Sequence, residues 1–225
     1  MTTRKSSVNN PEVQCPLCLA RPPAFTGEDR RRSFYRCSIC DLVFVAPSQH
    51  LTLAEERAQY AYHQNCPSDE RYRTFLKQLF VPVNAQLSPG SHGLDFGCGP
   101  GPTLHLLFEE AGHHMTVYDP AFAPDEAALS SRYDFITMSE VVEHLHHPFA
   151  VLERLWALLR PGGVLGIMTQ FLPEDVAVAQ WFYKNDDTHV CFFSTDTFAY
   201  LAKRLDAQLQ HNASNVALLY KRKTK

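Results

Sequence analysis

Four cysteines near the amino terminus constrain the fold of this chain more than any other residues. They form two Cys-x2-Cys pairs separated by eighteen residues, Cys15 with Cys18 and Cys37 with Cys40. Each pair can present two thiolates on one side of a tight turn, and this spacing is typical of a tetrahedral zinc site. Because four cysteine ligands leave no open coordination position, we expect a structural zinc ribbon over residues 13–46 that takes no part in the chemistry.

A redox pair and a disulfide framework are the alternatives for these cysteines. Two equally spaced pairs argue against both, as does the polar segment 1–10, which lacks the apolar core of a signal peptide. The further cysteines Cys66, Cys98 and Cys191 fit a reducing compartment, and no stretch approaches the length of a membrane span. We therefore expect a cytoplasmic protein without a membrane partner.

The composition is typical of a globular protein with a sizeable core. Of the 225 residues, 45% are hydrophobic and 20% are charged, which suits one ordinary domain plus a small module. A formal net charge of -3 argues against a protein that binds nucleic acid by charge alone. We interpret the densest basic segment, 30–32, as a solvated hairpin tip, with docking to nucleic acid as the alternative.

The sequence divides into four predicted segments. Residues 1–12 are expected to form a disordered leader and residues 13–46 the ribbon. Residues 47–89 carry apolar side chains at helical spacing and should form a helical connector. In residues 90–225, strand patterns alternate with helix patterns, which predicts a parallel sheet covered by helices on both faces.

The strands and helices of the larger domain can be placed individually. Strands are expected at 93–96, 115–118, 133–138 and 164–169, and an antiparallel pair at 207–210 and 216–220. Helices are expected at 102–111, 148–159 and 195–205. The predicted fold class is therefore α/β, with a Rossmann-like, mostly parallel sheet, an antiparallel closing hairpin and a small zinc ribbon.

A glycine-rich turn follows the first strand of this domain. Gly97, Gly99 and Gly101 lie between the strand end at Asp95 and the next helix. Glycines in such a turn let the backbone approach a ligand, and the helix amino terminus supplies amide donors. Asp119 ends the second strand, where a carboxylate can accept hydrogen bonds from ribose hydroxyls. Together these residues predict a nucleotide-like site.

Residues 94–101 resemble the first motif of the class I S-adenosylmethionine-dependent methyltransferases. Residues 117–120, 133–145 and 158–165 are similar to further motifs of that family, so the resemblance covers most of the larger domain. It implies a seven-stranded type of sheet and binding of S-adenosylmethionine. Because only residues 121–132 separate the second strand from the fourth, the third strand should be short or missing.

The resemblance also implies which residues contact S-adenosylmethionine. The glycine turn and the first acidic residue should follow the methionine and ribose parts, and the second acidic residue should hold the ribose diol. Residues 138–140 should line the pocket near the sulfonium, while Asp125 or Glu126 is a candidate reader of adenine. The implied contacts are Asp95, Gly97, Gly99, Gly101, Asp119, Met138, Ser139 and Glu140.

The ribbon and the connector resemble those of deoxysugar C-methyltransferases and their short bacterial relatives. Within residues 181–194, His189 matches a histidine of the sugar enzymes, but Thr188 stands where they have a glutamate. His189 is a candidate general base, because imidazole is the natural base near neutral pH. A structural histidine that orients its loop is the alternative. His144 is the second catalytic candidate, with support of the cofactor loop as its alternative role.

Three functions are compatible with the sequence. The favoured one is methyl transfer from S-adenosylmethionine to a small-molecule acceptor, with zinc as a structural metal and the aromatic residues 181–183 as walls of the acceptor pocket. An RNA methyltransferase whose ribbon docks the nucleic acid is the first alternative. The second is a non-catalytic interaction protein that retains the cofactor fold. The acceptor atom, whether C, N, O or S, is left open.

Overall fold

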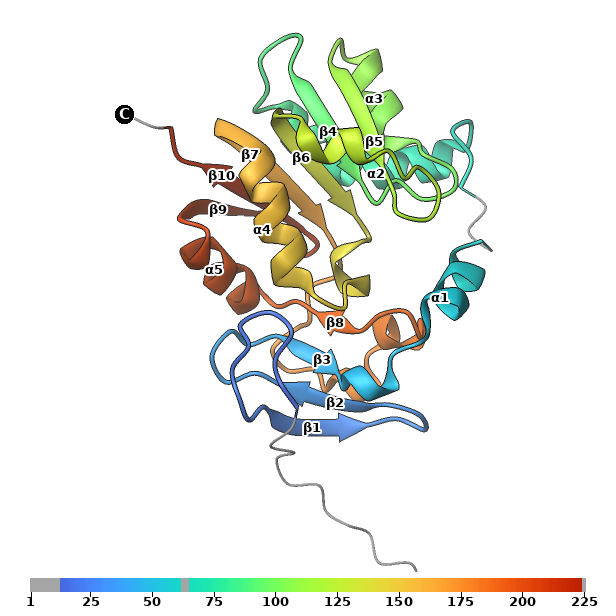
Figure 1. Ribbon diagram of the computed structural model, residues 1–225, viewed down its shortest axis with the longest axis vertical. Helices are drawn as coiled ribbons and strands as arrows, with labels where there is room; N and C mark the ends of the chain where they lie inside the picture. The colour runs from blue at the N-terminus through green and yellow to red at the C-terminus, as the bar shows by residue number, and fades with distance from the viewer. Residues whose placement is uncertain (1–12, 62–64, 224–225) are drawn as a thin grey trace, which may run out of the picture.

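A six-stranded sheet forms the centre of the protein in the computed structural model, which describes residues 13–61 and 65–223. The predicted leader, residues 1–12, lies outside these residues. The strands lie in the order β5-β4-β6-β7-β10-β9 (Figure 1). Their bounds are β4 (His92–Phe96), β5 (His114–Tyr118), β6 (Tyr133–Ser139), β7 (Leu159–Met168), β9 (Ala207–Asn212) and β10 (Val216–Lys221).

The pairing of these strands confirms the predicted α/β fold. β4 pairs in parallel with β5 and β6, and β6 pairs in parallel with β7. β10 is antiparallel to β7 and β9, which makes β9 and β10 the predicted closing hairpin. Residues 121–132 are all described and form one isolated bridge and the 3-10 helix η2 (Glu126–Ser130) but no strand, so the short or missing third strand is also confirmed.

Helices cover both faces of this sheet, as the alternating pattern predicted. Two of them, α2 and α3, share one apolar cluster with the sheet, while α4 and α5 share the cluster of the opposite face (Figure 1). Their bounds are α2 (Glu70–Asn84), α3 (Leu104–Glu110), α4 (Pro148–Leu158) and α5 (Thr195–Arg204).

The side chains of β7 explain why both faces are covered. Val164 and Met168 are buried against α2, whereas Leu165 and Ile167 are buried in the cluster of α4 and α5. Successive residues of a strand point to opposite faces, so every side chain in this stretch has an apolar partner layer. Burial of each such side chain contributes about 1.5–3 kcal/mol, which favours this two-sided arrangement over an exposed face.

The ribbon forms a second sheet, to which the larger domain contributes a strand. Its order is β1-β2-β3-β8, and β8 comes from a loop far along the chain. β8 pairs antiparallel with β3 through Val43 with Phe192 and Phe44 with Cys191. The sequence did not predict β1 or β8. The bounds are β1 (Ala24–Glu28), β2 (Ser33–Arg36), β3 (Val43–Val45) and β8 (Cys191–Phe192).

Arg32 joins the ribbon to the same loop. Its side chain is 5% exposed, and its guanidinium donates hydrogen bonds to the backbone carbonyls of Lys184, Asp186 and His189. The prediction of a solvated tip is therefore wrong for Arg32, because its charge is buried against carbonyl oxygens of the opposite segment. Arg30 remains exposed.

The connector lies beside the ribbon and the sheet. Its first α-helix, α1 (Leu53–Tyr60), begins at a capping box in which Thr52 and Glu55 bond each other's backbone amides. Among the described residues, no helix is both long enough and apolar enough to cross a membrane. The remaining 3-10 segments are η1 (Pro47–Gln49), η3 (Val142–His144), η4 (Val178–Gln180) and η5 (Phe182–Asn185).

The four cysteines of the ribbon lie together at one end of its sheet. The Sγ atoms of Cys15 and Cys40 are 3.5 Å apart, those of Cys18 and Cys37 are 3.3 Å apart, and all four lie within 4.8 Å of one another. Zinc–sulfur bonds of about 2.3 Å in a tetrahedron require sulfur separations of about 3.8 Å. The donor set and its spacing therefore fit a zinc ion, whose role there would be structural.

We predict one tightly held zinc per chain in this cluster. Since binding energy at such sites is folding energy, chelation should raise amide hydrogen exchange in β1–β3 and in β8, while β4–β7 stay protected. Cys37→Ser should have the same effect, and Cys66→Ser, at an exposed position, should have none. Elemental analysis that finds no metal in gently purified full-length protein would contradict the prediction.

Candidate functional site

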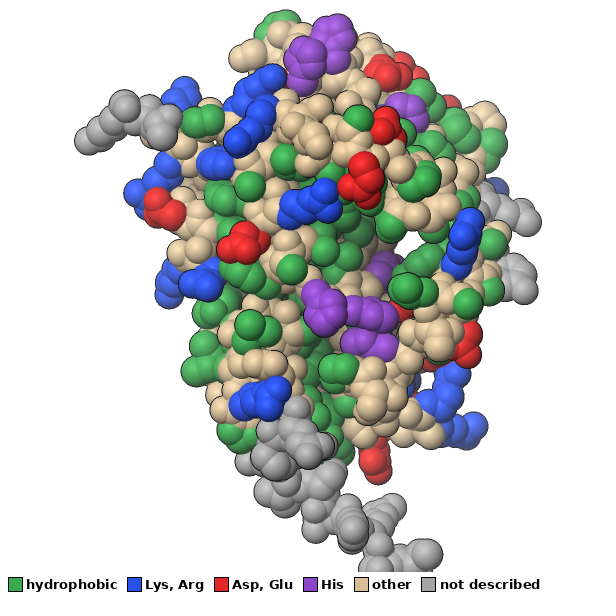
Figure 2. Space-filling view, viewed as in Figure 1, with side chains coloured by type: hydrophobic (Ala, Val, Ile, Leu, Met, Phe, Trp, Pro, Cys, Tyr) green, Lys and Arg blue, Asp and Glu red, His purple; other side chains and the backbone are tan. Residues whose placement is uncertain are grey.

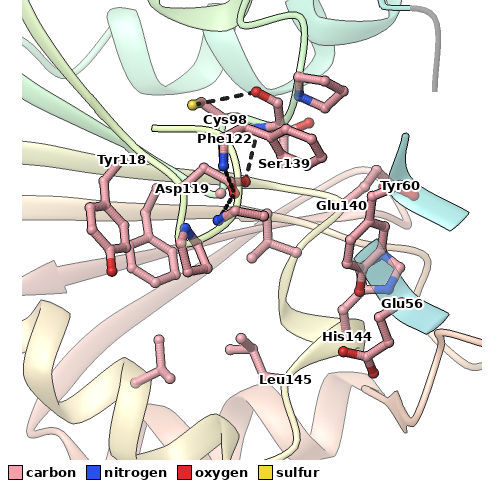
Figure 3. A pocket seen from close by; sticks show the side chains of 18 of the residues that line it. Glu56, Tyr60, Cys98, Tyr118, Asp119, Phe122, Ser139, Glu140, His144 and Leu145 are labelled. Atoms are coloured by element: carbon pink, nitrogen blue, oxygen red, sulfur yellow. Dashed lines mark hydrogen bonds between the residues drawn. The ribbon is translucent and has the colours of Figure 1, made fainter. Parts of the chain in front are cut away.

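A cavity of about 930 Å³ opens at the carboxyl ends of β4, β5 and β6. This edge of a parallel sheet is where open α/β folds carry their sites. In Figure 2 the surface is hollowed beside a group of histidine side chains. In Figure 3, Tyr118 and Asp119 lie toward one end of the cavity, and Tyr60, Glu140 and His144 toward the other.

The glycine turn after β4 forms part of the cavity wall. Gly97 and Gly99 have φ angles of 77° and 66°, in the left-handed region that favours glycine. A Cβ at Gly99 would meet no atom within 4 Å, so the backbone there is open to a ligand. Gly101 is different, because a Cβ there would come within 2.1 Å of the Asn65 carbonyl oxygen. Gly101 thus permits close packing and does not line the cavity.

Asp119, at the end of β5, holds this turn in place. Its Oδ2 accepts a hydrogen bond from the Gly99 amide at 3.0 Å. Its Oδ1 accepts from the amides of Ala121 at 2.8 Å and Phe122 at 3.1 Å (Figure 3). An ionised carboxylate has about four acceptor positions, so a position is left for a ligand hydroxyl at the cavity wall.

The other predicted contacts divide between the wall and the layer behind it. Of the three residues predicted to lie near the sulfonium, Ser139 and Glu140 line the cavity, whereas Met138 is fully buried in the core. Asp95 is also buried behind the wall, at 4% exposure, where Thr137 donates a hydrogen bond to it at 3.1 Å. Burial raises the pKa of Asp95 to about 7, although the Thr137 hydrogen bond opposes this shift.

An apolar wall lies beside the glycine turn, between β5 and α4. It suits a flat ring, because it combines aromatic and aliphatic side chains. The two candidate readers of adenine lie outside it: Asp125 caps η2, and Glu126 bonds Tyr118 and Arg154. The side chains of this wall are Tyr118, Phe122, Leu129, Val151 and Leu155.

The opposite end of the cavity is polar and rests on a buried group of hydroxyls and carboxylates. The Tyr183 hydroxyl contacts one oxygen of Glu143, Glu140 Oε2 at 3.0 Å and the Thr169 hydroxyl at 3.1 Å. The Tyr183 hydroxyl has one proton and can donate it to only one of the two carboxylates. The other carboxyl group must therefore carry a proton of its own, which it donates to the hydroxyl oxygen. Burial raises the pKa of both Glu140 and Glu143, which favours that proton.

The two predicted catalytic histidines meet at this polar end. His189 Nδ1 lies 2.7 Å from the Tyr183 carbonyl oxygen, and His144 Nδ1 lies 3.2 Å from that of Thr188. Because a carbonyl oxygen only accepts, each ring carries its proton on Nδ1, and in the neutral ring Nε2 has the lone pair. The ring centroids are 4.6 Å apart, and both histidines line the cavity.

Sequence reasoning missed several residues of this end. Tyr60 of α1 contacts His144 edge to face at 5.3 Å between ring centroids, but a lone tyrosine in a connector gave no signal. Glu143 lies within the motif of residues 133–145, and its spacing of three residues from Glu140 is the signal that could have identified it. Tyr183 supports the two glutamates from behind, and the exposed Phe182 does not line the cavity.

The buried Asp95 predicts a pH-dependent stability. Its folded pKa of about 7 exceeds the unfolded value of 3.8, so the folded state holds the extra proton between these values. The contribution of Asp95 to the free energy of unfolding therefore falls as pH rises through this window, by about 4 kcal/mol at most. The free energy of unfolding of Asp95→Asn, measured by denaturation at several pH values, should lack this fall. The exposed control Asp175→Asn should give the same pH profile as the wild type. Parallel profiles for both variants would contradict the assignment.

Comparisons with known proteins identify the family of this chain. Residues 60–212 match the model of a protein family described as "Methyltransferase domain". A ubiquinone biosynthesis O-methyltransferase of Cereibacter sphaeroides is 31% identical over 115 residues, which cover 40% of this chain and 44% of that protein. One from Vibrio vulnificus is 32% identical over 71 residues, which cover 32% and 30%. The match thus spans less than half the length of these curated relatives.

A solved structure extends the likeness over nearly the whole chain. It is that of a 1,6-didemethyltoxoflavin-N1-methyltransferase from Burkholderia thailandensis, with bound 1,6-didemethyltoxoflavin and S-adenosylhomocysteine. It covers 88% of this chain and 98% of its own, with a TM-score of 0.53 and 19% identity, which shows a shared fold. Since the family model covers well over half of the 225 residues, the chain belongs to this methyltransferase-domain family.

Proposed function

We propose that this protein transfers a methyl group from S-adenosylmethionine to a hydroxyl oxygen of a small aromatic or heterocyclic molecule. The observation that carries the proposal is the shape of this cavity, with a glycine turn and Asp119 at one end and two adjacent histidines at the other. The donor and the acceptor would lie in the same cavity, which is what direct transfer requires.

The residues at the donor end fit S-adenosylmethionine. The open backbone at Gly99 accommodates a ligand without a clash, and Asp119 offers a remaining acceptor position to the ribose diol. The apolar wall beside them suits the adenine ring, and Ser139 and Glu140 lie on the path toward the acceptor end. When bound, the cofactor supplies an electrophilic methyl group on sulfur.

The residues at the acceptor end position the nucleophile and promote loss of its proton. In an in-line transfer, the acceptor oxygen forms a bond to the methyl carbon, and the electrons of the broken carbon–sulfur bond stay on sulfur. We propose His189 as the main residue that promotes removal of the hydroxyl proton, with His144 beside it. Both rings are oriented by backbone carbonyls, so their Nε2 lone pairs are held in fixed directions.

The relatives support an acceptor of this class. The curated relatives are O-methyltransferases by name, and the structural neighbour holds a small heterocyclic acceptor. The alternative of an RNA acceptor has less support than the sequence alone suggested. Arg32 is buried against the loop, and Lys221 donates hydrogen bonds to the carbonyls of Trp156 and Leu159. By stabilising the ribbon, a zinc ion would also stabilise, through Arg32, the loop that carries His189.

The donor end can be tested with S-adenosylhomocysteine alone. Asp119→Ala should weaken its binding, because each lost hydrogen bond between the carboxylate and a ribose hydroxyl costs roughly 1.5–3 kcal/mol. Asp119→Asn keeps one oxygen acceptor and should lose less. The exposed control Glu153→Gln should bind as the wild type does in calorimetry. Unchanged affinity in Asp119→Ala would mean that the ribose lies elsewhere.

The acceptor end can be tested once a labelled-methyl screen of small hydroxylated aromatics has found a substrate. His189→Ala should lower turnover by on the order of 10²–10⁴, the usual worth of one positioned base, and leave the affinity for S-adenosylmethionine nearly intact. His189→Gln should restore little. His114→Ala, at an exposed position on the far edge of the sheet, serves as the control. Turnover near the wild-type rate in His189→Ala would make the residue structural.

A further inference from the structure

We propose that Glu143, His144 and His189 bind a divalent transition-metal ion at the acceptor end of the cavity, separate from the zinc of the ribbon. One potential ligand atom of each side chain lies within 4.8 Å of the other two. Two of the residues come from η3, and the third comes from the loop before β8. Ligands about 2.1 Å from an ion lie roughly 3–4.2 Å apart, so only a small contraction is needed.

The two histidines are already oriented as metal ligands are. A metal-binding histidine usually donates its other ring N–H to a carbonyl or a carboxylate, which fixes the tautomer and the direction of the ligand nitrogen. His189 and His144 both make this contact through Nδ1, to the Tyr183 and Thr188 carbonyls. With Nδ1 engaged in this way, Nε2 of each ring would be the nitrogen that holds an ion; His189 Nε2 also lies 3.9 Å from Asp186 Oδ2.

The buried glutamate provides an independent observation. Glu143 is fully buried, and its Oε1 accepts from Tyr183, but its Oε2 has no hydrogen-bond partner among the described residues. Glu140 Oε1 is likewise buried without a partner in the described part of the chain. A carboxylate oxygen buried in this way is costly unless something positive contacts it. A bound cation would provide the missing partner of Glu143 Oε2. Glu140 is close by, because its carboxylate contacts the same Tyr183 hydroxyl as Glu143 does.

The donor set indicates the class of ion. Two imidazole nitrogens and a carboxylate oxygen suit Zn²⁺, Mn²⁺, Fe²⁺ or Co²⁺, whereas Mg²⁺ and Ca²⁺ prefer oxygen ligands. The site also differs from the ribbon, whose four sulfurs fill a tetrahedron. Three protein ligands leave coordination positions open toward the cavity, as in catalytic metal sites.

Such an ion would refine the role of His189. This refinement rests on the proposed function, whereas binding of the ion does not. An acceptor hydroxyl in an open position would lose its proton to water at lower pH, because the cation stabilises the alkoxide or phenolate. That oxygen would then form its bond to the methyl carbon as the carbon–sulfur bond breaks, without oxidation or reduction. His189 would act by holding the ion, in place of taking the proton itself.

The test uses Co²⁺ and full-length protein that carries one zinc per chain. Because the four-cysteine site holds its zinc tightly, equilibrium dialysis should find one Co²⁺ per chain in addition to the ribbon zinc. Glu143→Gln and His144→Ala should each weaken Co²⁺ binding by about tenfold or more. His146→Ala, which changes a neighbouring cavity histidine outside the cluster, should leave it unchanged. Circular dichroism on each variant checks that it is folded.

Two results would overturn the proposal. One is the absence of a second metal in the folded wild type, and the other is undiminished Co²⁺ binding in both Glu143→Gln and His144→Ala. Calorimetry with S-adenosylhomocysteine on the same samples separates this proposal from the proposed function. Cofactor binding without Co²⁺ binding rejects the metal site alone, and Co²⁺ binding without cofactor binding rejects the methyl transfer alone.

Discussion

The parallel pairing of β4 with both β5 and β6 is the constraint on which the site depends. It brings three strand ends, at Phe96, Tyr118 and Ser139, to one edge of the sheet. The glycine turn, Asp119 and Glu140 follow these ends directly, so all three reach one cavity. A shift of one residue in either pairing would exchange the two faces of a strand, and the apolar layers on both sides oppose that shift.

Three acidic side chains gather at this edge of the sheet. Asp95 supports β4 through Thr137, while Glu140 and Glu143 converge on Tyr183. Burial raises the pKa of all three acids, so each favours a proton or a nearby positive group. Of the three, Glu140 lines the cavity, whereas Asp95 and Glu143 lie behind its wall. Each of them would ionise more readily beside a cation.

The sequence predicted most of the large sheet, because its signals are local. Apolar strands of four or more residues, such as 133–138, and glycine turns are readable from neighbouring residues alone. β8 was missed since two residues carry no periodicity, and its pairing with β3 joins segments far apart in the chain. The burial of Arg32 was missed because its partners also lie far away in the sequence. In the site, His144 and His189 were found through the resemblance, whereas Tyr60 could be placed only by the path of the connector.

The pairing of β3 with β8 also limits how this protein could be divided. Phe34 of the ribbon contacts Phe192 of β8 at 6.0 Å between ring centroids, and both rings are fully buried. A chain that began after residue 46 would expose Phe192 and leave three carbonyls of the histidine loop without their guanidinium donor. The ribbon therefore cannot be exchanged between relatives as an independent module. Any recombination that replaces it must carry residues 184–192 along with it.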